Sequence, residues 1–137
     1  MYRKILVPMA LDHGISPDTL AIAEALRAKD GMIIGLHVYE TPQGSVSAYL
    51  DAEVVQAGFD AAQSQLNDRI KDVPHASAAL IKGHSSRGII DYADANDVDL
   101  IVIGSHKPGL GRFLLGSTAA RVVRHANCAV HVRRSSD

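Results

Sequence analysis

The feature that most constrains the fold is an aliphatic run followed by a glycine-rich segment and a helical pattern. Leu100 to Ile103 show no polar alternation, which is typical of a strand buried on both faces of a parallel sheet. The run ends at Gly104, and a segment rich in glycine and basic residues leads to Gly116-Ser117-Thr118. Helical spacing of apolar and basic side chains follows over residues 119–126. The sequence therefore predicts a strand, a glycine-rich loop and a helix start in succession.

Such an arrangement suits a phosphate group. The first N–H groups of a helix lack partners within the helix, and its dipole favours an anion there. Gly116 would allow a ligand to approach the backbone, while Ser117 and Thr118 would either cap the helix or bind a phosphate oxygen. A plain strand-to-helix turn with a serine cap is the alternative, and neither G-x-G-x-x-G nor G-x-x-x-x-G-K-[ST] is present.

The charge distribution favours an anionic ligand. The chain has 14 basic and 15 acidic residues. Residues 104–136 contain no Asp or Glu, while the first 103 residues hold 14 of the acidic ones. Positive charge beside a glycine-rich loop favours an anion. The basic residues of this region are Lys107, Arg112, Arg121, Arg124, Arg133 and Arg134.

Several segments together resemble the universal stress protein (UspA-like) family, over nearly the whole chain. The most specific are Ile103-Gly104-Ser105-His106 and Leu114-Leu115-Gly116-Ser117. The others are Ala119 to Ala126, Val130-His131-Val132, Lys4 to Pro8 and Leu36-His37-Val38. The late loop resembles the family's G-S-H/R-x-P…L-L-G-S variant, with Lys107 where the usual nucleotide-binding pattern has a second glycine.

This resemblance implies a doubly wound, Rossmann-like α/β domain over residues 1–137, with helices on both faces of a five-stranded parallel sheet in the order 3-2-1-4-5. Ligands bind such sheets at the carboxyl ends of the strands where the order reverses. It also implies an adenine-nucleotide site, holding ATP or AMP, with or without Mg²⁺. The implied site residues are Pro8, Met9, Ala10, Leu11, Val38, Gly104, Ser105, His106, Lys107, Arg112, Gly116, Ser117 and Thr118.

Several of these implied site residues have a second interpretation. Relatives commonly carry an aspartate near the ribose where this chain has Ala10, and Asp12 would replace it only if the loop folds back. Lys107 and Arg112 are either phosphate contacts or exposed loop charges. His106 would contact a ribose or phosphate oxygen, or hydrogen-bond its own loop.

Composition and periodicity independently predict alternating strands and helices. An aliphatic core without tryptophan suits α/β layers, and 137 residues suit one domain. Strands are expected at residues 5–8, 32–39, 77–82, 100–103 and 128–132. The first helix is expected from Ser16-Pro17 to about Lys29, with Gly31 closing it. The second is expected from about residue 50 to Asp72, with Gly58 as a weak point. Two further helices are expected after residues 83–86 and from residue 117.

Other observations bound the function. The single cysteine, Cys128, excludes an internal disulfide and is expected to be a small buried hydrophobe. The chain lacks a signal-peptide core and a long apolar run, so a cytoplasmic protein without membrane insertion is expected. Histidine and cysteine spacing does not indicate a metal site. A net charge of −1 with few aromatic residues argues against nucleic-acid binding.

Three functional classes remain open. The first is a stress-response regulator that binds an adenine nucleotide and is read by a partner protein or by its own dimer. The second is an enzyme, at most a slow ATPase, since no carboxylate pair for Mg²⁺ lies within the late motif. The third is a nucleotide-free interaction module, which Lys107 and Ala10 keep open. A homodimer is expected through the edge strand Cys128 to Val132, which the resemblance implies pairs with its symmetry mate.

Overall fold

The computed structural model describes residues 1–12, 17–40, 52–105 and 115–134. Its described elements alternate strand and helix in the order β1 (Tyr2–Pro8), α1 (Pro17–Leu26), β2 (Arg27–Tyr39), α3 (Ala52–Ile70), β3 (Ala76–Lys82), α4 (Ser85–Ala95), β4 (Leu100–Gly104), α5 (Ser117–His125) and β5 (Ala129–Arg133). All strand pairs are parallel, and the sheet order is β3-β2-β1-β4-β5. This confirms the expected doubly wound α/β fold.

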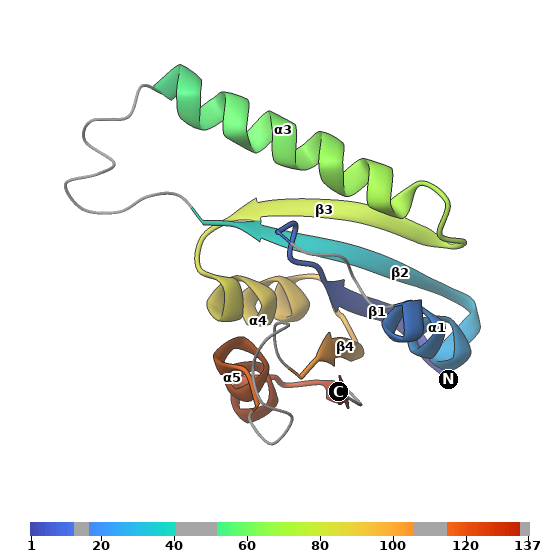
Figure 1. Cartoon of the computed structure of the whole chain (residues 1–137). Coiled ribbons are helices and arrows are strands. Elements are labelled where there is room, and N and C mark those ends of the chain that lie inside the picture. The colour runs from blue at the N-terminus through green and yellow to red at the C-terminus, as the bar shows by residue number, and fades with distance from the viewer. Residues whose placement is uncertain (13–16, 41–51, 106–114, 135–137) are drawn as a thin grey trace.

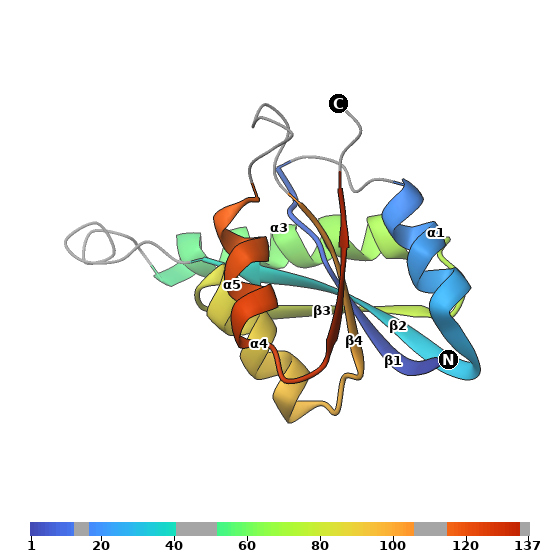
Figure 2. The same cartoon turned by 90° about the horizontal axis from the view of Figure 1, so that it is seen from below.

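Helices cover both faces of the sheet (Figures 1 and 2). Strand residues with alternating numbers supply two separate cores, because successive side chains point to opposite faces. Leu6, Ile101 and Ile103 pack with α4 and α5 on one face. Ile5 and Val102 pack with α1 and α3 on the other. Both faces of the central strands are thus buried, as their unbroken aliphatic runs predicted.

The boundary between α1 and β2 differs from the sequence-based expectation. The helix was expected to reach about Lys29, but it ends at Leu26, and β2 begins at Arg27 rather than Met32. The Arg27 guanidinium donates hydrogen bonds to the carbonyls of Ala28, Lys29 and Gly31, at 3.1, 3.1 and 3.0 Å. The backbone therefore turns around this side chain instead of continuing the helix.

Gly31 consequently lies in β2 and does not close a helix. The register between β1 and β2 shifts between Tyr2 and Lys4. A β-carbon at Gly31 would lie 2.7 Å from the carbonyl oxygen of Tyr2. Close approach of the two strands is the reason for glycine at this position.

The strand β1 begins at Tyr2, three residues before the expected start at Ile5, and the remaining boundaries agree within one or two residues. The α3 helix passes through Gly58 without a break, and a side chain there would collide with the Tyr39 hydroxyl. The Tyr39 ring packs edge-on against Phe59, with centroids 5.7 Å apart. Gly58 thus makes room for the end of β2. The expected cap at Ser16 lies outside the described residues.

Candidate functional site

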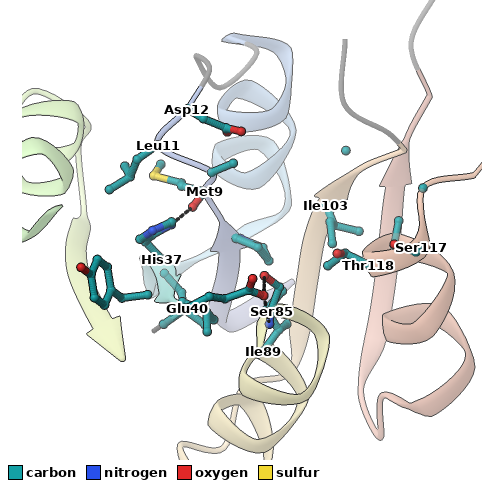
Figure 3. A pocket seen from close by; sticks show the side chains of 18 of the residues that line it. Met9, Leu11, Asp12, His37, Glu40, Ser85, Ile89, Ile103, Ser117 and Thr118 are labelled. Atoms are coloured by element: carbon teal, nitrogen blue, oxygen red, sulfur yellow. Dashed lines mark hydrogen bonds between the residues drawn. The ribbon is translucent and has the colours of Figure 1, made fainter. Parts of the chain in front are cut away.

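A cavity of about 670 Å³ lies at the carboxyl ends of β1, β2 and β4, where the strand order reverses (Figure 3). Its size is within the range of small-molecule sites, about 300–1,000 Å³. Ten of the sequence-predicted site residues line it: Pro8, Met9, Ala10, Leu11, Val38, Gly104, Ser105, Gly116, Ser117 and Thr118. The other three, His106, Lys107 and Arg112, lie outside the described residues.

The start of α5 forms one end of the cavity. Gly116 is the N-cap, with φ −58° and ψ 152°, so Ser117 is the first helical residue rather than the cap. The Gly116 N–H donates to the Ser105 carbonyl at 2.6 Å, and the Ser105 N–H donates to the Arg133 carbonyl at 2.9 Å. Ser105 is only 3% exposed. These bonds fix the helix start to the ends of β4 and β5.

Open hydrogen-bond donors remain at this end. Within the described part of the chain, the N–H groups of Ser117 and Thr118 have no acceptor. A glycine N-cap has no side-chain oxygen to supply one. The unpaired donors and the helix dipole together favour an anion.

The wall formed by β2 and α4 has apolar side chains. Val38 and Ile89 on this wall are 7% and 3% exposed, and Ile103, beside the start of α5 (Figure 3), is 6% exposed. Gly88 lets α4 approach β2, since a β-carbon there would lie 3.0 Å from a Val38 methyl group. Apolar walls of this kind suit a flat heterocycle better than a charged group.

The N-terminus of α4, which also lies at the cavity, already binds a carboxylate of the protein. Glu40 follows β2, and its Oε1 accepts hydrogen bonds from the Ser85 N–H and hydroxyl at 2.9 and 2.7 Å. Both residues line the cavity (Figure 3). The N-terminus of α4 therefore already has an anion, which leaves α5 as the anion-receptive end.

Sequence reasoning missed several lining residues, namely Leu36, His37, Tyr39, Glu40, Ser85, Ile89, Ile103 and Ala119. Glu40 and Ser85 were recognisable in principle, because each directly follows a strand and carboxyl ends of parallel strands meet at one edge. Asp12, the suggested replacement for the absent aspartate at Ala10, does line the cavity. Its loop thus reaches the site.

The charged lining differs from the sequence-based expectation. None of the Lys or Arg residues that the structure describes lines the cavity, whereas Asp12 and Glu40 do. Arg133 instead forms an ion pair with Asp18 at 3.1 Å. Arg121 and Arg124 lie exposed on α5. In the described part of the site, the groups available to an anion are therefore main-chain donors rather than these side chains.

The described residues contain neither a metal-binding cluster nor a membrane-spanning helix. No cluster of three or more His, Cys, Asp or Glu side chains there has the arrangement of a metal site. Among the described helices, none has the length and apolar character needed to cross a membrane.

Comparison with known proteins decides the family. The model of the universal stress protein family matches residues 1–134. The chain belongs to the universal stress protein family. Universal stress protein G of Salmonella typhimurium is 34% identical over 143 residues, covering 98% of this chain and all of the relative. A universal stress protein of Methanothermobacter thermautotrophicus is 30% identical, covering 98% and 97% of the two chains.

Solved structures agree with this assignment. A hypothetical protein whose biochemical function was assigned from its structure superposes with a TM-score of 0.81 at 26% identity, covering 100% of this chain and 99% of that one. More distant universal stress proteins share the fold. One from Archaeoglobus fulgidus was solved with dAMP (TM-score 0.57, 23% identity, 96% and 97% coverage). Another, from Arabidopsis thaliana, has AMP bound (TM-score 0.61, 20% identity, 98% and 94% coverage).

Proposed function

We propose that this universal stress protein binds an adenine nucleotide in the cavity at the carboxyl ends of β1 and β4. The observation that carries the proposal is the open helix start at Ser117 and Thr118, whose N–H groups have no acceptor within the described residues. An anion is the natural ligand of such a helix start. Structures of family members with AMP and dAMP support a nucleotide as the source of that anion.

The two ends of the cavity suit the two ends of a nucleotide. The phosphate group lies at Gly104, Gly116, Ser117 and Thr118, close to main-chain donors. The base lies against Val38 and Ile89, between α4 and the segment after β1, Pro8 to Leu11. The Glu40 carboxylate at the start of α4 disfavours the reverse orientation, because two anions would repel each other there.

Gly104 supports a ligand close to the backbone. A β-carbon at this position would meet no atom of the described residues within 4 Å, and the φ of Gly104 is not in the left-handed region. Neither packing against the described residues nor backbone conformation therefore requires glycine here. A ligand that lies against the exposed backbone of Gly104 would account for it.

The nucleotide is ATP or AMP, with Mg²⁺ accompanying a polyphosphate. His106, Lys107 and Arg112 belong to the proposal as further ligand contacts from the sequence. The biological role is that of a cytoplasmic stress-response regulator whose nucleotide state is read by a partner protein or by a homodimer formed through the β5 edge. One domain over residues 1–137 carries this role.

Calorimetric titration tests the proposal. The wild-type protein, stripped of any ligand it carries through purification, is titrated with AMP, ATP and GTP, with and without Mg²⁺. Saturable binding of AMP or ATP at a one-to-one ratio is expected, with GTP weaker. Absence of binding by every nucleotide would favour the alternative of a nucleotide-free interaction module. Multiple turnover of ATP at ordinary enzyme rates, above about 1 per second, would move the protein into the enzyme class.

A further inference from the structure

Two side chains of α3 hold the backbone that follows β1. Arg69 donates one hydrogen bond to the Ala10 carbonyl at 3.0 Å and another to the Leu11 carbonyl at 3.1 Å. Gln65 Nε2 donates to the same Leu11 carbonyl at 2.9 Å. These bonds join residues 54 to 59 positions apart. They fasten a cavity wall to a helix whose residues do not line the cavity.

A third side chain holds the carbonyl of the preceding residue, Met9. His37 Nδ1 lies 2.7 Å from the Met9 carbonyl (Figure 3). Because a carbonyl oxygen only accepts, this nitrogen carries the proton. The Met9 N–H donates to the Leu36 carbonyl at 2.7 Å. Three successive carbonyls, those of Met9, Ala10 and Leu11, are therefore taken by side chains from β2 and α3.

Because peptide groups are planar, fixing these carbonyls also fixes the direction of the N–H groups that follow them. In a trans peptide the N–H points opposite to the carbonyl of the preceding residue. The N–H of Ala10 thus points away from His37, and the N–H of Leu11 points away from Arg69. Within the described part of the chain, neither N–H has an acceptor. Both residues are half-buried and line the cavity.

Unpaired donors in a half-buried wall are costly unless a ligand or water binds them. We propose that Arg69 and Gln65 are positioning residues for ligand binding: they hold the segment after β1 so that the N–H groups of Ala10 and Leu11 meet an acceptor atom of the nucleoside. This inference rests on the proposed nucleotide function. It assigns these two N–H groups as a second set of donors, separate from those at the start of α5.

The geometry also explains why arginine stands at position 69. A planar guanidinium presents several N–H groups in a fixed fork and can hold two neighbouring carbonyls at once. A lysine ammonium at the same place carries its donors on one nitrogen and does not reproduce the two separate nitrogens with which Arg69 holds the two carbonyls. Arg69→Lys is therefore expected to retain only part of the effect.

Matched substitutions separate positioning from general stability. Arg69→Met and Gln65→Leu remove the donors to the segment after β1. Gln63→Leu is the control on the same helix. Among the described residues, Gln63 Nε2 donates only to Asn67, at 3.0 Å, and not to the segment after β1. Arg87→Met is the control for loss of an arginine, since Arg87 pairs with Asp91 on the exposed face of α4.

The affinity for AMP is measured by calorimetry, and the amide shifts of Ala10, Leu11, Ser117 and Thr118 are followed by NMR at saturating AMP. Arg69→Met and Gln65→Leu are expected to weaken binding about three- to tenfold, as for one lost hydrogen bond, with Arg69→Lys in between and both controls within twofold of wild type. In wild type all four amides shift on binding. In the two variants the shifts of Ala10 and Leu11 shrink, while those of Ser117 and Thr118 remain.

The contradicting outcomes are distinct. If wild type binds AMP but its Ala10 and Leu11 amides do not shift, or if the variants bind as wild type does, the positioning role is wrong and the proposed function stands. If all four shifts shrink together along with the melting temperature, Arg69 and Gln65 only stabilise the fold. If wild type binds no AMP, the proposed function fails and this inference fails with it.

Discussion

At the scale of single residues, the glycines divide into those that the fold requires and those that it does not. A β-carbon at Gly31 would lie 2.7 Å from the backbone carbonyl oxygen of Tyr2 in the neighbouring strand, so one of the two strands would have to shift. A β-carbon at Gly104 would meet no atom of the described residues within 4 Å. The first position is fixed by strand packing, and the second is available to a ligand.

Gly31→Ala tests this division. We expect it to lower the free energy of unfolding by about 1–3 kcal/mol, as other overpacking substitutions do. Gly104→Ala is the matched control and is expected to change it by less than about 0.5 kcal/mol. Urea unfolding of both variants measures the difference. Equal stability of the two would show that β1 and β2 have room at Gly31.

Cys128 offers a second measurement at this scale. Burial, followed by the negative charges of Asp94 and Asp99, raises the pKa of the Cys128 thiol above its ordinary value of 9.0. A raised pKa means that the folded protein favours the neutral thiol, so the associated stability is present below pH 9.0 and is lost as the pH rises through the folded pKa. Alkylation requires the thiolate.

We therefore expect iodoacetamide to modify the folded protein more slowly at pH 8 than the urea-unfolded chain. The rate of thiol loss, measured in both states at the same temperature, checks this. The difference should narrow as the pH is raised above the folded pKa. Cys128 is half-buried, and a folded protein that reacts as fast as the unfolded one would contradict this partial burial.

At the scale of elements, local patterns predicted which segments form strands and helices, because buried runs and helical periodicity are local signals. They did not predict that α1 stops at Leu26, since this depends on the Arg27 side chain meeting three carbonyls after the chain has turned. In the site, too, some residues are predictable from local patterns and others depend on the fold. The glycines and Ser117 are visible in the sequence, whereas Glu40 and Ser85 become neighbours only through the parallel arrangement of β2 and β3.

The β5 edge carries a prediction about assembly. In the described sheet β5 pairs only with β4, so its other edge has N–H and C=O groups available to a second strand. Cys128, Val130 and Val132 pack on the core, as the sequence predicted. We propose an isologous dimer through this edge, and light scattering at micromolar concentration is expected to give twice the mass of one chain, 14.6 kDa.

Proline substitutions at Val130 and, separately, at His131 locate the interface. Adjacent N–H groups in a strand point to opposite sides, so one of the two bonds β4 and the other faces the free edge. The variant at the free edge should be a folded monomer, and the other should lose stability. A wild-type monomer, or two folded dimeric proline variants, would exclude this interface.

At the scale of the whole molecule, the sheet brings together segments that are far apart in the chain. The carboxyl ends of β1 and β4 are separated by about two thirds of the sequence, yet both line one cavity with the start of α5. The distribution of charge along the sequence predicted an anion beside the glycines. Among the described residues, the donors available at this place are main-chain groups, because the basic side chains of α5 and β5 do not line the cavity.

The central claim is that a nucleotide phosphate binds at the start of α5, and titration of AMP and ATP into wild type and Gly116→Val tests it most directly. The φ and ψ of Gly116, −58° and 152°, are accessible to valine, so the thermal melt should change little while the added side chain crowds the phosphate. Exposed Arg124→Leu, at the far end of the same helix, is the control. We predict saturable binding by wild type and Arg124→Leu and none by a folded Gly116→Val. Unchanged affinity in folded Gly116→Val would contradict the account.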